Sequence, residues 1–303
     1  MFRYLLHAAR GECGGYLPIT FSSNGADALL YNAPLHFLFR GFCMLKNILA
    51  ACTLALAVVV QAQPQGTLLE RINDGGTVVI GTEGTYAPFT YHDASGKLTG
   101  YDVEVARLVG EKLGVTIQFE ETPWDAMLAG LKAGRFDLVA NQVALSSPER
   151  QATFDRSEPY NFYGAMLVVH KDNEDIKTIA DIKGRKAAQT LSSNYGERAR
   201  KEGAEIVPVD GMAQSLMLIE QGRADLTLNN SLALLDYFQK NPSHQLKSVW
   251  EVPAEEQLGA GLVANKGNDE ALAKISAAIV ELRKEGKLKA LGEQFFGKDV
   301  SVQ

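Results

Sequence analysis

The stretch Asn141–Tyr160, NQVALSSPERQATFDRSEPY, joins two apolar runs and carries the polar groups of a possible binding site. Phe136–Ala140 before it and Tyr163–Val169 after it are short and apolar, as buried strands are. Between them, Arg150 follows two serines. A guanidinium is a planar fork of donors that fits both oxygens of a carboxylate, and hydroxyls can add further donors. The stretch therefore predicts either a carboxylate-binding turn at the mouth of a strand or a surface arginine in a helix-starting turn.

An export signal is indicated by the residues that follow Met44. Residues 44–62, MLKNILAACTLALAVVVQA, combine a basic start at Lys46 with an apolar stretch to Val60 and a small-x-small cleavage site ending at Ala62. The apolar stretch is shorter than the roughly 20 residues that a membrane-spanning helix needs. We therefore expect a cleavable signal peptide, a periplasmic location and a mature chain that begins at Gln63. Residues 1–43 precede this complete signal and show no clean helical or strand period, so we interpret them as a mis-assigned extension.

Cysteine content and charge restrict the function of the mature chain. All three cysteines precede residue 62, which excludes a disulfide, thiol catalysis and a cysteine metal site after it. The remaining chain has 26 Lys and Arg against 34 Asp and Glu, a net charge of −8 without basic clusters, so we expect no nucleic-acid partner. His92, His170 and His244 lie far apart in the sequence and form no metal-binding motif. We expect no metal and no cofactor.

Short apolar runs alternate with amphipathic patterns in the first part of the mature chain. The apolar residues of Tyr101–Leu113 recur at helical spacing and form one stripe. The strands and helices expected here are, in order, Thr77–Thr82, Tyr101–Leu113, Val115–Glu120, Trp124–Ala133 and Phe136–Ala140. This strand-helix-strand order predicts a parallel sheet covered by helices.

The alternation restarts after Pro159. A further apolar run, Leu258–Val263, precedes two helical patterns, Glu270–Arg283 and Leu288–Phe296. Two such rhythms in about 240 residues predict two lobes with a ligand cleft between them. The strands expected in the second rhythm are Ala165–His170, Lys186–Gln189, Glu205–Val209 and Ala224–Leu228, and the helices are Asn194–Glu202, Ala213–Gln221 and Ser231–Lys240.

Several ordered sequence blocks together carry a family resemblance, which covers nearly all of Leu68–Val300. The blocks are Gly81–Phe89 (GTEGTYAPF), Gly96–Asp102 (GKLTGYD), Trp124–Leu131 (WDAMLAGL), Gly134–Val139 (GRFDLV), Pro148–Arg150 (PER), Ser157–Tyr160 (SEPY), Ser193–Tyr195 (SNY) and Gly222–Asp225 (GRAD). With these blocks the chain resembles the extracytoplasmic solute-binding proteins of bacterial ABC importers for polar amino acids, family 3, and most closely their cystine-binding branch.

The resemblance implies an α/β, two-lobed periplasmic-binding-protein fold of type II. Two parallel-type sheets with flanking helices would be joined by a two-segment hinge. Lobe 1 would comprise residues 66–160 plus 257–303, and lobe 2 residues 161–256.

The resemblance also implies which groups hold the α-carboxylate of the ligand. Arg150, a hydroxyl just before it and Ser193 of the second lobe would bind this group, and the helix that starts at Ser193 would favour an anion. The family usually places Ser or Thr five positions before the arginine, where this chain has Leu145. Because the loop looks one residue longer than usual, Ser146 or Ser147 would substitute.

The rest of the implied site surrounds the ligand side chain and ammonium group. Tyr86, Phe89 and Trp124 would flank the side chain, and Glu83 would contact the ammonium. The second-lobe aspartate of the family falls on Asn230, which accepts a hydrogen bond but supplies no charge. The implied ligand-binding residues are together Glu83, Tyr86, Phe89, Trp124, Asn141, Ser146, Ser147, Arg150, Ser193, Asn194, Tyr195 and Asn230.

The function that these features favour is capture of a polar amino acid, cystine or a related one, for an ABC transporter permease in the inner membrane. The protein would act as a monomer and would not be an enzyme, so no catalytic residue is assigned. The alternative is a periplasmic dehydratase of the cyclohexadienyl type on the same fold, which would need a general acid or base such as Glu83 or Glu104. Product formation from prephenate or arogenate would distinguish the enzyme from the binding protein.

Overall fold

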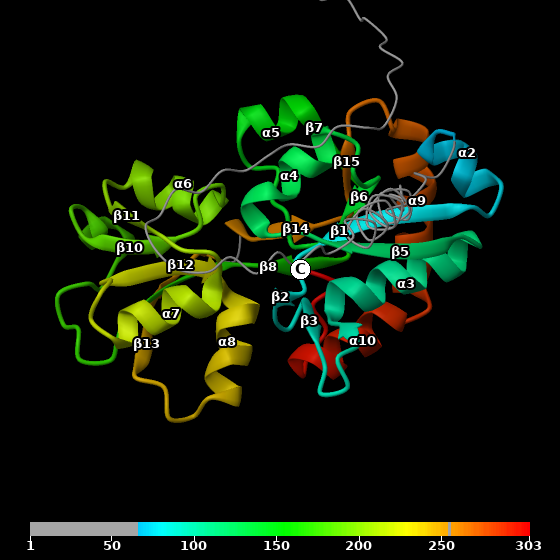
Figure 1. Cartoon of the computed structure of the whole chain (residues 1–303). Helices are drawn as coiled ribbons and strands as arrows, with labels where there is room; N and C mark the ends of the chain where they lie inside the picture. The colour runs from blue at the N-terminus through cyan, green and yellow to red at the C-terminus, as the bar shows by residue number, and fades with distance from the viewer. Residues whose placement is uncertain (1–65, 254–255) are drawn as a thin grey trace, which may run out of the picture. The chain divides into compact units, whose positions relative to one another are not determined.

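The computed structural model describes residues 66–253 and 256–303 (Figure 1). The expected extension over residues 1–43 and the expected signal peptide over residues 44–62 lie outside these ranges. Among the described residues, no helix combines the length and the apolar character needed to cross a membrane.

The first sheet has five strands in the order β5-β1-β6-β15-β7. Strands β1 and β5 pair in parallel, β6 pairs in parallel with β1, and β15 pairs antiparallel with both β6 and β7. Helices α3 (Tyr101–Leu113) and α4 (Trp124–Lys132) provide the connections between β1, β5 and β6. The strands are β1 (Thr77–Thr82), β5 (Thr116–Glu121), β6 (Leu138–Val139), β7 (Phe154–Arg156) and β15 (Val263–Asn265).

The second sheet also has five strands, in the order β11-β10-β12-β9-β13. Strand β10 pairs in parallel with β11 and β12, whereas β9 pairs antiparallel with β12 and β13. The strands are β9 (Ala165–His170), β10 (Lys186–Gln189), β11 (Glu205–Pro208), β12 (Leu226–Asn230) and β13 (Leu246–Glu251). The helices of this region are α6 (Asn194–Lys201), α7 (Met212–Glu220) and α8 (Ser231–Lys240), with the short 3-10 helix η1 (Ile179–Ile182).

The remaining elements complete the region around the first sheet and connect it to the second. Helix α9 (Asp269–Lys284) packs on α3 and on α2 (Leu68–Asn73), and α10 (Lys287–Phe296) packs on α3 and α9 (Figure 1). Strand β8 (Asn161–Tyr163) pairs antiparallel with β14 (Leu258–Ala260) in a sheet of its own. A small three-stranded sheet holds β2 (Thr85–Tyr86), β3 (Thr90–His92) and β4 (Leu98–Thr99), and α5 (Pro148–Thr153) lies between β6 and β7 in sequence.

Each five-stranded sheet is covered by apolar side chains of its helices. Around the first sheet, Ile80, Val105 and Ile279 belong to one buried cluster that α3 and α9 share with β1. Around the second sheet, Val168 and Leu216 belong to a separate cluster that includes α7. Burying each such side chain stabilises the fold by about 1.5–3 kcal/mol. Further buried clusters contain residues of the first and the second sheet, one with Val79, Met127 and Val263 and one with Leu167, Ala187 and Leu226, respectively. Two five-stranded sheets with their own buried clusters agree with the expected two-lobed α/β class.

The mixed direction of the strands is a feature that the alternation of patterns did not predict. The parallel pairs expected from the strand-helix-strand rhythm are present, but β7, β15, β9 and β13 make antiparallel pairs. The apolar run Leu258–Val263 contributes to two strands in different sheets. The break lies at Gly261, where a Cβ would approach the backbone oxygen of Ser157 to 2.7 Å, so only glycine allows this close contact. The lobe boundaries at 160/161 and 256/257 stay a prediction.

Candidate functional site

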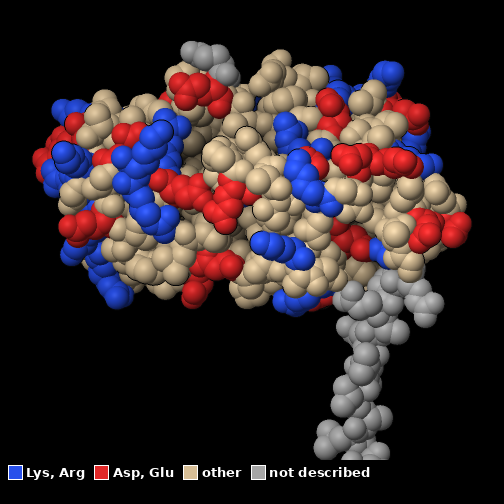
Figure 2. All heavy atoms as spheres, turned by 90° about the horizontal axis from the view of Figure 1, so that it is seen from above, with Lys and Arg blue, Asp and Glu red and all other residues tan. Residues whose placement is uncertain are grey.

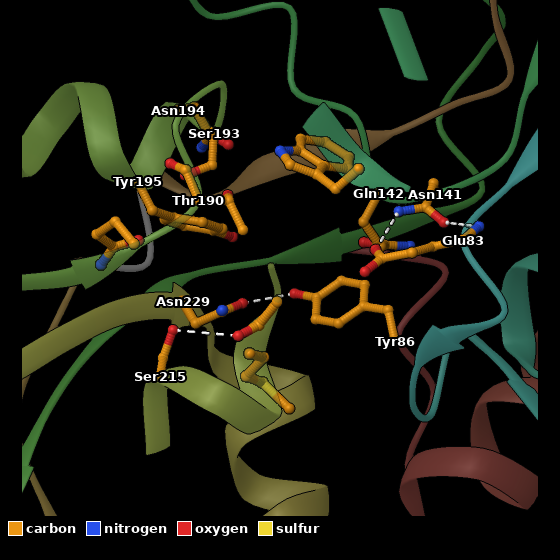
Figure 3. A pocket seen from close by; sticks show the side chains of 14 residues that line it. Glu83, Tyr86, Asn141, Gln142, Thr190, Ser193, Asn194, Tyr195, Ser215 and Asn229 are labelled. Carbon is orange, nitrogen blue, oxygen red and sulfur yellow. Dashed lines mark hydrogen bonds between the residues drawn. The ribbon is translucent and has the colours of Figure 1, made fainter. Parts of the chain in front are cut away.

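A pocket lies between the two sheets and takes its walls from both (Figure 3). Its volume is about 40 Å³, room for roughly three water molecules when one needs about 10–15 Å³. The lining residues are Glu83, Tyr86, Trp124, Asn141, Gln142, Gln189, Thr190, Ser193, Asn194, Tyr195, Gly211, Met212, Ser215 and Asn229.

The first wall is built where two parallel strands of the first sheet end. Glu83 directly follows β1, and Asn141 comes two residues after β6, so both side chains reach the same sheet edge, where ligands of parallel sheets commonly bind. The Oδ1 of Asn141 accepts a hydrogen bond from the backbone N–H of Glu83 at 2.8 Å, and its Nδ2 donates to Glu83 Oε2 at 3.2 Å (Figure 3). The hydroxyl of Thr85 donates to Glu83 Oε1 at 3.1 Å. The Glu83 carboxylate is thus held in one orientation.

Among the described residues that line the pocket, Glu83 is the only ionisable acid or base other than the two tyrosines. Burial raises the pKa of its carboxyl group, the hydrogen bonds from Asn141 and Thr85 partly oppose this, and the nearby charge of Asp125 adds to it. A raised pKa means that the surroundings do not fully stabilise the negative charge of the carboxylate. A cationic ligand group would therefore be bound favourably beside it. A primary ammonium fits this requirement.

Tyr86 links the two walls. Its hydroxyl donates to Asn229 Oδ1 at 2.6 Å, and Asn229 lies in β12 of the second sheet (Figure 3). The same Oδ1 accepts the backbone N–H of Asn230 at 2.8 Å. The Tyr86 ring rests on Phe89, with ring centroids 5.4 Å apart. This bond places an amide from the second sheet opposite the Glu83 wall.

The second wall presents the start of helix α6 to the pocket. Ser193 is the N-cap of α6, and its Oγ accepts the N–H of Gly196 at 3.0 Å. Thr190, Ser193 and Asn194 stand together on this wall (Figure 3). The start of a helix carries free N–H groups and a partial positive charge, so it favours an anionic ligand group. A carboxylate on one wall of the pocket therefore faces a helix N-terminus on the other wall.

Arg150 does not line the pocket but lies behind the α6 wall. Its side chain is buried, one amino group donates to Ala144 O at 2.8 Å, and the other donates to the backbone oxygen of Ser192. Burial lowers the pKa of the guanidinium, and the charge of Glu197 opposes this. Arg150 thus contacts Ser192, the residue before Ser193, on the side of the pocket that favours an anion.

Gln142 connects the pocket to a buried polar network. It has φ 54°, which a non-glycine residue rarely adopts. Asp102 holds it there by accepting its backbone N–H at 2.9 Å and its side-chain Nε2 at 2.7 Å. The Gln142 Oε1 accepts the amide groups of Asn161 and Asn230, each at 3.3 Å. Burial raises the pKa of Asp102 to about 7, although the bonds from Gln142 oppose the shift.

The structure brings seven of the expected site residues to the pocket and leaves five off its lining. Phe89 is fully buried beneath Tyr86, because Gly100, with φ 123°, lets the start of α3 close over its backbone. Of the residues expected to bind the carboxylate, Ser147 caps α5 by accepting the N–H of Arg150 at 3.3 Å, and Ser146 faces a different hollow.

Asn230 has two structural partners instead of a place on the pocket wall. It is fully buried. Its Oδ1 accepts the N–H of Leu232 at 2.9 Å as the cap of α8, and its Nδ2 contacts Gln142. The neighbouring residue Asn229 faces the pocket instead.

Seven lining residues were missed by the sequence interpretation: Gln142, Gln189, Thr190, Gly211, Met212, Ser215 and Asn229. Two patterns could have indicated them. Thr190 follows the end of β10, the position where parallel strands place ligand groups. Asn229 is next to the expected Asn230, an error of one position in register, whereas Gln142 lines the pocket together with its expected neighbour Asn141.

Charged side chains and possible metal ligands also lie outside the pocket, on one face of the molecule and among the described residues respectively. On the face seen in Figure 2, acidic and basic side chains are interspersed and neither sign covers the whole face. Within residues 66–253 and 256–303, no group of three or more His, Cys, Asp or Glu side chains is arranged to hold a metal ion.

Proteins with similar sequences are named as amino-acid-binding proteins. The "Probable amino-acid ABC transporter-binding protein" of Haemophilus influenzae is 46% identical over 236 residues, 78% of this chain and 91% of that protein. The "L-cystine-binding protein TcyA" of Bacillus subtilis is 43% identical over 237 residues, 78% of this chain and 87% of that protein.

Solved structures resemble the chain as well. The L-cystine solute receptor of Neisseria gonorrhoeae in the unliganded open conformation is 69% identical, with a TM-score of 0.57, over 78% of this chain and 100% of that one. An ancestral arginine-binding protein bound to arginine is 32% identical, with a TM-score of 0.68, over 73% of this chain and 99% of that one. The family model of the bacterial extracellular solute-binding proteins, family 3, matches residues 78–298 of this chain. The family and its solved structures confirm the expected two-lobed α/β class. With these relatives and this match over most of its length, the chain belongs to the bacterial extracellular solute-binding proteins of family 3.

Proposed function

We propose that the protein captures a polar amino acid, with L-cystine as the first candidate, and delivers it to the permease of an ABC importer. The observation that carries this proposal is the opposition of Glu83 to the start of α6 across one pocket. The carboxylate of Glu83 suits the ammonium of an α-amino acid. The amides of α6, assisted by Arg150 behind them, suit its carboxylate. A zwitterion satisfies both walls together.

L-Cystine is preferred among polar amino acids because relatives of high identity are named for it. The B. subtilis relative and the N. gonorrhoeae receptor are both named as cystine-binding. The pocket adds Met212, Trp124 and Tyr195, whose polarizable or aromatic surfaces suit a disulfide better than a charged side chain. Arginine, bound by the less similar ancestral protein, would need a second acid besides Glu83.

Capture proceeds by closure of one lobe on the other. Tyr86 and Asn229, and Arg150 and Ser192, already bridge the two walls, and the remaining volume is about 40 Å³. The 69%-identical open receptor overlaps less well than the 32%-identical arginine-bound protein, which supports two lobe arrangements for one fold. A ligand shifts the ratio of closed to open protein only if it binds the closed form more tightly than the open form. A difference in binding free energy of about 5.5 kcal/mol changes that ratio from 1:99 to 99:1.

The place of action and the partner follow from the same proposal. Residues 44–62 would direct the chain to the periplasm, the mature protein would act as a monomer, and its closed form would be the one that the permease recognises. A dehydratase on this fold would need Glu83 to act as a general acid, which its raised pKa permits. The named relatives of high identity are binding proteins and do not favour this alternative.

Mass spectrometry of ligand retained by gently purified protein, followed by calorimetry with L-cystine, L-arginine and L-glutamine, tests the proposal. We expect L-cystine to bind most tightly and to leave the protein chemically unchanged. Conversion of prephenate or arogenate by the purified protein, without amino-acid binding, would overturn it.

A further inference from the structure

The loop at the start of α6 is held by two charged side chains from the region of the first sheet, neither of which lines the pocket. Asp125 Oδ1 accepts the backbone N–H of Ser192 at 2.9 Å and its hydroxyl at 2.6 Å, and Oδ2 accepts the N–H of Leu191 at 3.3 Å. Arg150 donates to the backbone oxygen of the same Ser192. A carboxylate on the N–H side and a guanidinium on the C=O side match the polarity of this segment of backbone.

The hydrogen bonds of Asp125 cross the boundary between the region of the first sheet and the region of the second sheet. Asp125 lies in the first turn of α4, beside the first sheet, while Leu191 and Ser192 follow β10 of the second sheet. Within its own region the loop is already shaped, because Arg200 donates to Leu191 O at 2.9 Å and Ser193 donates to Thr190 O at 3.3 Å. The three bonds to Asp125 therefore act on a preformed loop.

The loop also carries part of the pocket wall. Thr190, Ser193 and Asn194 line the pocket on either side of the segment that Asp125 binds (Figure 3). Asp125 itself is exposed at the rim and is absent from the lining, although its neighbour Trp124 is part of it. Asp125 can thus influence the position of the anion-favouring wall without touching a ligand.

We propose that Asp125 is a positioning residue that fastens the Thr190–Asn194 loop to the first lobe when the cleft is shut. It acts mainly on the rate at which a captured ligand leaves, because its bonds exist only when the two walls meet and must break before the cleft opens. This role rests on the proposed function for its effect on binding, but the bonds themselves can be measured with any ligand that shuts the cleft.

The kinetic test uses L-cystine and the variants Asp125→Ala and Ser192→Ala in stopped-flow tryptophan fluorescence. We expect Asp125→Ala to raise the dissociation rate about tenfold, equivalent to about 1.4 kcal/mol, and to change the association rate by less than about twofold. Ser192→Ala removes only the hydroxyl bond and should have a smaller effect. In the double variant the hydroxyl bond is already lost, so Ser192→Ala should add little to Asp125→Ala.

Asp269→Ala is the matched control, because Asp269 is also an exposed acid in the first turn of a helix, α9. It should leave both rates unchanged. An unchanged dissociation rate in Asp125→Ala, or an equal fall in association and dissociation rates, would overturn the proposal.

Amide hydrogen exchange of the protein saturated with the ligand that mass spectrometry identifies separates this proposal from the assignment of L-cystine, because the bonds to Asp125 exist only in the shut form. The N–H groups of Leu191 and Ser192 should exchange faster in Asp125→Ala than in wild type and in Asp269→Ala. If wild type does not bind L-cystine but this difference is seen, the ligand assignment fails and the fastening role stands. If the exchange rates are equal, the fastening role fails whatever the protein binds.

Discussion

Glu83→Gln tests the charge complementarity of the pocket directly. Glutamine keeps the shape of the side chain and can still accept from Thr85, but it removes the charge and places an NH₂ group against Asn141 or Thr85. Charge-assisted hydrogen bonds contribute about 1.5–3 kcal/mol, so we expect affinity for L-cystine to fall roughly 10- to 150-fold. The stability of the ligand-free protein should not fall comparably, because burial disfavours the charged form of Glu83.

Titration calorimetry with two ligands gives this prediction its specificity. L-Cystine should lose affinity for Glu83→Gln, whereas 3,3'-dithiodipropionic acid, which lacks both ammonium groups, should bind both proteins alike. Glu121→Gln is the matched control, because Glu121 ends β5 one strand away, is exposed and is not part of the pocket. The reasoning is refuted if Glu83→Gln binds L-cystine as tightly as Glu121→Gln does.

The same carboxylate determines the expected pH dependence of binding. Because the pKa of Glu83 is raised in the protein, the group takes up a proton at a higher pH than a free glutamate does. Affinity for an ammonium should therefore fall as the pH drops through that pKa, and binding in that range should release a proton from Glu83. Calorimetry in two buffers of different ionisation enthalpy measures this release, and in Glu83→Gln the contribution should be absent.

Three further substitutions probe the surroundings of the pocket. Arg150→Ala should weaken L-cystine binding by about 100-fold, because a buried charge-assisted partner is lost, and circular dichroism would check that the fold is retained. Asn230→Asp keeps the cap of α8 but cannot donate to Gln142 Oε1 unless it is protonated. It should destabilise the protein by about 1–3 kcal/mol above neutral pH and less in acid, and tighter ligand binding without destabilisation would contradict this role. Asp102 is buried with a pKa raised to about 7, so the folded state binds its proton more tightly than the unfolded state, and its stabilising contribution is lost as pH rises toward 7. Relative to Asp102→Asn, wild type should lose roughly 3 kcal/mol of unfolding free energy between pH 5 and 8, measured by denaturant titration, and parallel pH profiles would show that Asp102 does not titrate there.

Local sequence patterns predicted the helices and strands well where the hydrophobic pattern was clear and the ends of the element were well marked. Tyr101–Leu113 has an apolar stripe and ends at Gly114, and Ala165–His170 is a short apolar run, and both are observed with the expected bounds. Short strands at sheet edges were not anticipated, among them β7 and β13. Their sequences mix polar and apolar residues, so they carry little periodic signal.

The sequence predicted which kinds of residue form the candidate site better than it predicted their exact positions. Glu83, Tyr86 and Ser193 were expected from the sequence and line the pocket, whereas Asn229 lines it in place of Asn230. In a strand, successive side chains point to opposite faces, so a shift of one residue moves an amide from the pocket to the core. A motif cannot decide this where two asparagines are adjacent.

The sequence by itself determined the class of protein. The order of strands, helices and short motifs specifies an α/β chain of two rhythms, because hydrophobic periodicity and turn residues act locally. Only the tertiary structure decided which side chains from distant segments meet. Asp125 and Ser192 are 67 positions apart, and Tyr86 and Asn229 are 143 apart. Their contacts depend on how two separately folded sheets face one another, and no local pattern encodes that geometry.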